Sequence, residues 1–232
     1  MSDAEKLKTE YENKKGKIKE RLGQFEKFFR EPCSWFYAGN EMKLLPVETK
    51  DDHRIFEELC FCIFTANASA EMGMRSVDAI RNILIDGTAE EMTRRIINIH
   101  RFAVIRPQYI IHTREYLKNS INFELKKKIL SFTNKNELRD FIALNKDIKG
   151  LRYKEASHFL RNIGFKGYAI LDQHIINSLH EFGFLQKNDP PKNPKQYLEF
   201  EQKFIDFSKQ VGIDMDELDL LLWSRKNGRI LK

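Results

Sequence analysis

A glycine turn between short helices is the feature that most constrains how this chain can fold. Gly150 directly precedes a helical pattern that runs from Tyr153 to Ile163, and glycine readily adopts the backbone conformations that such a turn requires. Lys154 lies in the first turn of this helix, one turn after Gly150. Asp172 stands at the expected start of the next helix, 18 residues after that lysine. An amine and a carboxylate, each at a helix start, are therefore predicted to face each other across a cleft.

The rest of the chain has mostly helical periodicity, which predicts an all-α protein. An apolar stripe marks a long first helix that Pro32 ends, and the all-apolar stretch Leu59–Phe64 marks a buried one. No segment is predicted as a strand, and residues 31–52 are expected to form a connector. Further helices are expected at residues 52–67, 69–84, 88–99, 107–117, 123–132, 136–144, 153–163, 172–182, 195–211 and 215–223.

Composition narrows the class of protein. The 232 residues are 41% hydrophobic and include 18 phenylalanines, which is typical of a globular protein. The charged residues, 32% of the chain, are of mixed sign, which argues against disorder. The net charge of +6 and the pI of about 9.1 are compatible with a phosphate-bearing partner. Many proteins without such a partner share this charge.

Membrane insertion and secretion are not expected. No stretch approaches the roughly 20 apolar residues that span a bilayer, and the N-terminus has no apolar signal region. Cys60 and Cys62 lie in an apolar run, and Cys33 makes the number of cysteines odd. Buried free thiols suit a reducing compartment. We therefore expect a cytoplasmic protein.

The region of the glycine turn resembles the helix-hairpin-helix DNA glycosylases, and most closely the archaeal-type 8-oxoguanine DNA glycosylase/AP lyases. The resemblance extends from about residue 55 to the C-terminus. One departure is Arg152, where the usual hairpin has a second glycine. The segments that carry the resemblance are Gly150, Lys154, Ala156, residues 157–162 and 171–174, and further residues 59–67, 100–102 and 223–232.

The resemblance implies a catalytic pair, Lys154 and Asp172. A helix N-terminus and partial burial both disfavour the charged form of a lysine, so that Lys154 can attack C1′ of a flipped-out nucleotide and form a Schiff base. By the resemblance, Asp172 assists the lysine and stabilises the positive charge that develops on the sugar. The residues alone leave two alternatives open: a solvated surface lysine, and an aspartate that only caps its helix, which stabilises it by about 1 kcal/mol.

The resemblance also implies a pocket for the damaged base near the end of the chain. Trp223 would stack on the base, and the terminal carboxylate of Lys232 would accept hydrogen bonds from the guanine edge. Phe102 is a candidate for a second stacking face. The alternatives are that Trp223 and Phe102 belong to the core and that Lys232 is a frayed end.

Four further residues are candidates for contacts with DNA. The backbone amides that follow Gly150 can hold a phosphate, and Arg152 can contact one through its side chain. His174 would contact the DNA backbone. By the resemblance, Asn67 would occupy the gap left by the flipped base and contact its orphaned partner. Ordinary structural roles in a turn, at a helix start and at a helix end are the alternatives.

The resemblance implies a two-lobed helix-hairpin-helix glycosylase, all-α as the periodicity predicts, with its active site between the lobes. Residues 73–170 would form a helical bundle, and residues 1–72 plus 171–232 the second lobe. The predicted substrate is double-stranded DNA that contains 8-oxoguanine, bound by a monomer without a cofactor; no metal is needed for the chemistry, although a monovalent ion at the hairpin is possible. Two alternatives stay open: a different damaged base, and a DNA-binding module without catalysis.

Overall fold

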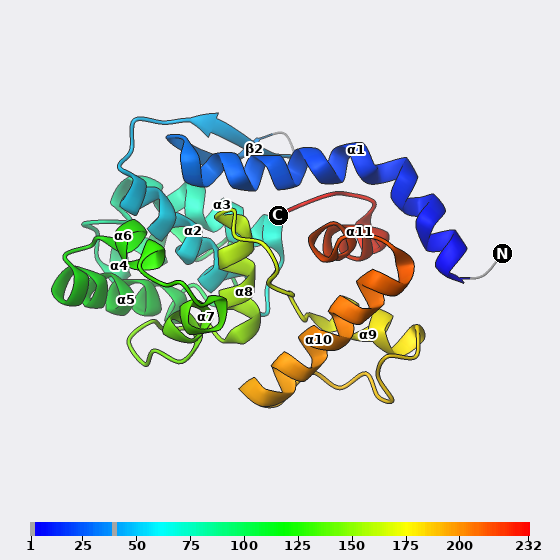
Figure 1. The fold of residues 1–232 in the computed structure, drawn as a ribbon. Coiled ribbons are helices and arrows are strands. Elements are labelled where there is room, and N and C mark those ends of the chain that lie inside the picture. The colour runs from blue at the N-terminus through cyan, green and yellow to red at the C-terminus, as the bar shows by residue number, and fades with distance from the viewer. Residues whose placement is uncertain (1–2, 39–40) are drawn as a thin grey trace.

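Helices make up most of the protein, for which a computed structural model describes residues 3–38 and 41–232. Figure 1 shows them as two groups beneath the long first helix. The elements are α1 (Asp3–Arg30), β1 (Cys33–Ala38), β2 (Glu41–Pro46), α2 (Asp51–Thr65), α3 (Ala70–Ile80), the 3₁₀ helix η1 (Arg81–Ile83), α4 (Ala89–Ile96), α5 (Ile105–Ile121), α6 (Leu125–Leu130), α7 (Lys135–Ala143), α8 (Tyr153–Asn162), α9 (Gln173–Glu181), α10 (Pro194–Val211) and α11 (Met215–Asn227).

The prediction of a strandless connector at residues 31–52 is wrong. Strands β1 and β2 pair in an antiparallel hairpin, in which Cys33 lies opposite Pro46 and Ala38 opposite Glu41. Trp35 at the centre of β1 is buried, and aromatic residues favour such a half-buried pleated surface. Gly39-Asn40 is a common hairpin connection that signals this pairing, and its own structure lies outside the described residues. The hairpin adds a small sheet to an otherwise helical fold.

Helix α2 lies at the centre of the larger group of helices. Every residue from Arg54 to Phe64 is buried, as the all-apolar stretch predicts. The helix packs against α3, α5, α6 and α8. Its last turn and the residues after it therefore reach the region where α8 begins.

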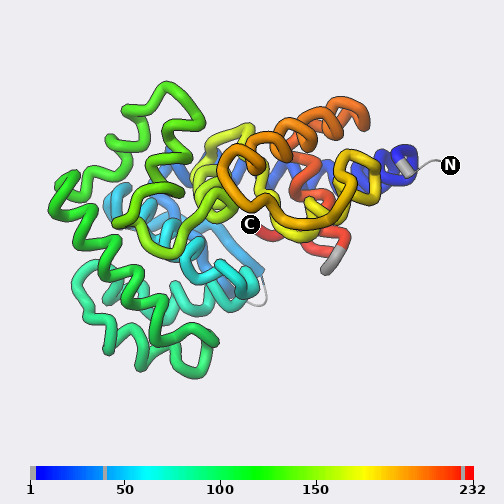
Figure 2. Tube along the Cα trace, turned by 90° about the horizontal axis from the view of Figure 1, so that it is seen from below, coloured from blue at the N-terminus to red at the C-terminus, as the bar shows by residue number. Residues whose placement is uncertain are grey.

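The last helices form the smaller group, in which α11 packs against α9 and α10. Helix α1 also packs along α11 and contacts α8, so it connects the two groups (Figure 1). Figures 1 and 2 both place the C-terminus near the middle of the molecule, between the groups. Among residues 3–38 and 41–232, no helix has the length and apolar character that crossing a membrane demands.

Candidate active site

The turn before α8 has the backbone conformation that requires glycine. Gly150 has a φ of +80°, and a Cβ at this position would approach the ring of Tyr109 to 2.9 Å. Two residues later, Arg152 has an ordinary φ of −118°, so this position needs no glycine. The backbone N–H of Arg152 donates to Glu155 at 3.2 Å, which closes the first turn of α8. The hairpin turn predicted at Gly150 is confirmed.

Lys154 is the second residue of α8 and is partly buried there. Its side chain is 34% exposed, and its Nζ lies 3.1 Å from Oε1 of Glu155. Since Glu155 also caps the helix through Arg152, this carboxylate restrains the amine at the helix start. Lys154 therefore differs from a freely solvated surface lysine.

Asp172 caps α9, as the sequence predicts. Its Oδ1 accepts hydrogen bonds from the backbone N–H groups of His174 and Ile175 at 2.8 and 3.0 Å. These bonds fix the carboxylate at the N-terminus of the helix, where the helix dipole also favours a negative charge. The second carboxylate oxygen accepts neither of these two hydrogen bonds.

A buried network holds the segment that leads to Asp172. The hydroxyl of Tyr197 accepts from the backbone N–H of Leu171 at 3.2 Å and donates to the carbonyl of Ala169 at 2.7 Å. Glu201 accepts from the N–H of Ala169 at 3.0 Å and forms hydrogen bonds of 2.7 and 2.9 Å with Arg139. Helix α10 therefore positions the backbone immediately before the candidate carboxylate.

Four of the predicted site residues line one pocket, which has a volume of about 110 Å³. They are Lys154, Asp172, Trp223 and Lys232. The pocket lies where α8, the start of α9, helix α11 and the end of the chain meet. Its other lining residues are Thr65, Ala68, Ala70, Glu155, His158, Arg161, Ile170, Asp219, Leu220 and Leu231.

The side chain of Lys232 occupies a buried socket and is not frayed. Its ammonium lies 3.9 Å from the ring centre of Phe61 and 5.1 Å from that of Trp35, and it is paired with Glu58. The other oxygen of Glu58 accepts from Asn162 at 2.7 Å. An acidic group between aromatic rings is selective for a cation, which explains why a lysine fits here. Sequence reasoning missed these partners, because they lie far from residue 232 in the chain.

The remaining predicted site residues take different places. Trp223 is half-buried in the pocket wall and packs against the core. Phe102 is half-buried outside that wall, with the guanidinium groups of Arg101 and Arg106 at 4.7 and 5.1 Å from its ring centre. His174 lies beside Arg225 in a shallow surface depression. The structure therefore brings neither Phe102 nor His174 into the pocket with Lys154.

Two predicted DNA contacts line a separate hollow next to the hairpin turn, together with Gly150. This hollow has a volume of about 780 Å³, and Asn67, Arg106, Lys149 and Arg152 contribute to its surface. Asn67 has a φ of 58°, a conformation that asparagine tolerates better than most residues. The left-handed backbone conformation by itself therefore explains why asparagine follows α2 here, independently of any contact with DNA. The hollow combines three cationic side chains and the carboxylate of Glu155 with the partly exposed Gly150.

Asp219 is a site residue that sequence reasoning missed. It is 7% exposed and lies 2.9 Å from Nη1 of Arg161 in the pocket wall. Burial raises the pKa of Asp219 to about 7, since it outweighs the attraction of Arg161, and the charges of Asp172 and Asp216 act in the same direction. The available signal was a carboxylate inside the apolar run 218–222.

The raised pKa gives the stability a pH dependence with a defined sign. Asp219 binds its proton up to about pH 7 in the folded protein, but only up to its ordinary value of 3.8 when unfolded. The free energy of unfolding therefore falls as the pH rises between these values. We expect Asp219→Asn to flatten this slope by up to about 1.4 kcal/mol per pH unit, measured by urea unfolding. An unchanged slope would contradict the assignment. Glu57 and Asp216, whose pKa values rise to about 7 and about 6, retain part of the slope.

Comparisons with known proteins identify the family. Residues 40–213 match the family model described as 8-oxoguanine DNA glycosylase. The 8-oxoguanine DNA glycosylase/AP lyase of Methanocaldococcus jannaschii is 38% identical over 186 residues, which are 80% of this chain and 86% of the relative. The protein of the same name from Fusobacterium nucleatum is 35% identical over 220 residues, 93% of this chain and 100% of the relative.

Solved structures agree with these sequence comparisons. The crystal structure of the M. jannaschii 8-oxoguanine DNA glycosylase superposes with a TM-score of 0.81 and 32% identity, covering 99% of this chain and 95% of that one. The M. jannaschii 8-oxoguanine glycosylase/lyase in complex with a 15mer DNA containing 8-oxoguanine superposes with a TM-score of 0.79 and 32% identity, covering 97% and 99% of the two chains. The fold and the sequence together place this chain in the 8-oxoguanine DNA glycosylase family.

Proposed function

We propose that this protein excises 8-oxoguanine from double-stranded DNA and cleaves the strand at the resulting abasic site. The observation that carries the proposal is the pocket that Lys154 and Asp172 share with Trp223 and Lys232. A nucleophilic amine, a carboxylate and a surface for the base are the parts that this reaction needs. The names of the relatives, and the DNA complex of one of them, support the same reaction.

The proposed chemistry begins with Lys154. The nucleotide flips out of the duplex. The ammonium of Lys154, which is paired with Glu155, first gives up a proton to solvent, and the resulting free amine attacks C1′ of the sugar. The bond from C1′ to the base nitrogen breaks, and the electron pair leaves with the base, which takes up a proton. The sugar ring opens to a Schiff base between C1′ and Nζ. Loss of a C2′ proton then expels the 3′ phosphate by β-elimination, and hydrolysis frees the lysine.

Asp172 would support this reaction electrostatically. Positive charge develops on the sugar as the base leaves, and a fixed carboxylate stabilises it most when it does not have to reorganise. The two backbone hydrogen bonds to Asp172 provide this fixation. Arg161 pairs with Asp219 on the neighbouring wall, which limits the excess negative charge around the lysine.

The base would be recognised by Trp223 and by the end of the chain. The half-buried indole offers a stacking surface, and a carboxylate at Lys232 would accept hydrogen bonds from N1–H and the N2 amine of a guanine-type base. The socket around the ammonium of Lys232 would hold that carboxylate in place. Phe102 stays a candidate for the second stacking face.

The DNA strand would run past the hairpin turn. We infer that the backbone amides after Gly150 and the side chain of Arg152 hold a phosphate, since both border the same hollow. Asn67, which lines the same hollow, would face the orphaned base. His174, which lines a separate surface depression, would contact the DNA backbone.

The division into lobes also stays a proposal. Residues 73–170 contribute Lys154 to the pocket, and residues 171–232 contribute Asp172 and Trp223, which supports a site between the two parts. Helix α2, however, belongs to the segment 1–72 and packs against α5, α6 and α8, which lie within residues 73–170.

We further propose that the protein acts as a cytoplasmic monomer. Light scattering of the protein alone and with duplex DNA tests its oligomeric state.

A borohydride trapping experiment tests the proposed function. The protein is incubated with a duplex that carries one 8-oxoguanine, and borohydride reduces any Schiff base to a stable protein–DNA adduct. An adduct with this duplex and none with the undamaged duplex is the expected result. An adduct only with another damaged base would overturn the assigned substrate, and lesion-independent binding without an adduct would favour a non-catalytic module.

Removal of Lys232 tests the base pocket. We expect the shortened chain to excise 8-oxoguanine at least about tenfold more slowly, because hydrogen bonds to a charged group are lost. Cleavage of a duplex with a preformed abasic site should change little, since that substrate has no base to hold. Lys232→Met tests the socket separately, because it retains the main-chain carboxylate but removes the ammonium that pairs with Glu58. Equal loss of both activities on removal of Lys232 would argue against the pocket.

A further inference from the structure

The end of the chain crosses a large hollow before it reaches the base pocket. Residues 228–231 form one wall of this hollow, which has a volume of about 800 Å³, and helix α1 and strand β2 form the others. Leu231 lines both the hollow and the base pocket. The final segment therefore separates the two spaces, and any shift of this segment changes the shape of the base pocket.

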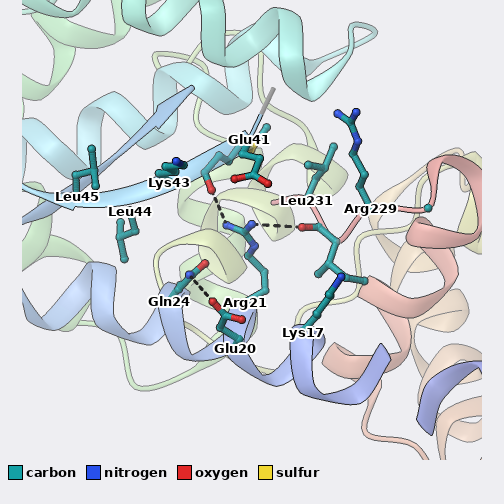
Figure 3. A pocket seen from close by; sticks show the side chains of 13 residues that line it. Lys17, Glu20, Arg21, Gln24, Glu41, Lys43, Leu44, Leu45, Arg229 and Leu231 are labelled. Atoms are coloured by element: carbon teal, nitrogen blue, oxygen red, sulfur yellow. Dashed lines mark hydrogen bonds between the residues drawn. The ribbon is translucent and has the colours of Figure 1, made fainter. Parts of the chain in front are cut away.

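Arg21 of α1 bridges the hollow (Figure 3). One terminal nitrogen of its guanidinium donates to the carbonyl of Ile230 at 3.3 Å, and the other donates to the carbonyl of Met42 on β2 at 3.5 Å. The guanidinium also lies 5.0 Å from the ring centre of Trp35, the residue that forms part of the socket for Lys232. Arg21 therefore connects the hairpin, the final segment and the lysine socket.

We propose that Arg21 is a positioning residue for base recognition, which fixes the final segment so that Lys232 stays in the base pocket. This inference rests on the proposed function. It assigns part of the selectivity for the damaged base to helix α1. Arg21 lines the hollow and not the base pocket, so it acts through the final segment. Arginine suits this role because its planar fork donates in two directions at once.

A positioning role for Arg21 predicts different effects on base excision and on cleavage at an abasic site. Excision of a base needs the base pocket in its correct shape, and the final segment forms part of that wall. Cleavage at an abasic site needs Lys154 and Asp172 but no base contact. Loss of Arg21 should therefore impair excision selectively, whereas general destabilisation would impair both reactions.

Two measurements on Arg21→Ala test the proposal. The first is the single-turnover rate on a duplex with 8-oxoguanine, compared with the rate on the same duplex with an abasic site. The second is amide hydrogen exchange in residues 228–232, which reports opening of the final segment whether or not 8-oxoguanine is the substrate. Lys17→Ala is the matched control, because it removes a positive charge from the same wall of the hollow and retains both hydrogen bonds of Arg21.

We expect Arg21→Ala to slow excision at least about tenfold, to change abasic-site cleavage less than about threefold, and to speed exchange in residues 228–232. Arg21→Lys should restore part of the excision rate, because lysine can reach one carbonyl. Unchanged exchange, or equal loss of both reactions, would overturn the proposal. If the unmodified protein does not excise 8-oxoguanine but Arg21→Ala still speeds exchange, the proposed function fails and the positioning role stands.

Discussion

Lys154→Gln is expected to abolish strand cleavage and the borohydride-trapped adduct while the affinity for damaged duplex stays nearly unchanged. Glutamine has no amine that can form a Schiff base, so the cleavage rate should fall on the order of 10³-fold or more, as when other enzymes lose a nucleophile. Binding should change by one phosphate contact at most, because the substitution removes a single charge. Single-turnover cleavage and a binding titration with the same duplex measure the two effects.

Lys149→Gln provides the matched control for this prediction. Lys149 lies just before the glycine turn and lines the hollow next to the hairpin, outside the wall of the pocket that contains Lys154. This variant should still form the adduct, and its DNA binding should become less dependent on salt. Strand cleavage that survives in Lys154→Gln would show that another group is the nucleophile.

Arg139→Met is expected to lower the free energy of unfolding by about 3–5 kcal/mol, the usual effect of removing one partner of a buried ion pair. Arg139 is 0% exposed and Glu201 is 4% exposed, so the substitution leaves a carboxylate in the interior. Lys135, 3.9 Å from Glu201 and itself partly exposed, compensates only in part. Urea unfolding at neutral pH measures the loss.

The double variant Arg139→Met with Glu201→Leu tests the cause of this loss. Replacement of both partners by apolar side chains removes the uncompensated charge, so the double variant should be more stable than Arg139→Met alone. Part of the loss should remain, because Glu201 also accepts the N–H of Ala169. A loss below about 1 kcal/mol in Arg139→Met would show that the pair contributes little.

The helices and their starts are the part of the fold that can be predicted from the sequence. Local signals decide them: Thr88 and Glu91 form a capping box at the start of α4, Asn134 caps α7, and Asp172 caps α9, at the helix start expected for it. The boundaries differ by a few residues, as for α11, which continues to Asn227. The hairpin escaped prediction because β1 is buried at three successive positions and lacks the alternating pattern that marks a half-buried strand.

The candidate site was predictable where a family pattern marks it and not where distant segments meet. Lys154, Asp172, Trp223 and Lys232 converge on one pocket, whereas their catalytic and binding roles stay predictions. The partners of Lys232 come from a strand and a helix near the start of the chain, and no local pattern links them to residue 232. Asp219 was hidden for another reason, since its charge state depends on burial.

Helix α1 has a consequence for the order in which the molecule assembles. Tyr11 bonds to Glu217 across 206 residues, Lys14 to Ser224 across 210, and Arg21 to Ile230 across 209. Such contacts close very long loops, so they are expected to form after the contacts between elements that lie nearer in the sequence. The candidate phosphate surface at the hairpin is therefore expected to mature before the candidate base pocket. If the proposed function holds, a partly folded chain would bind DNA before it could discriminate a lesion.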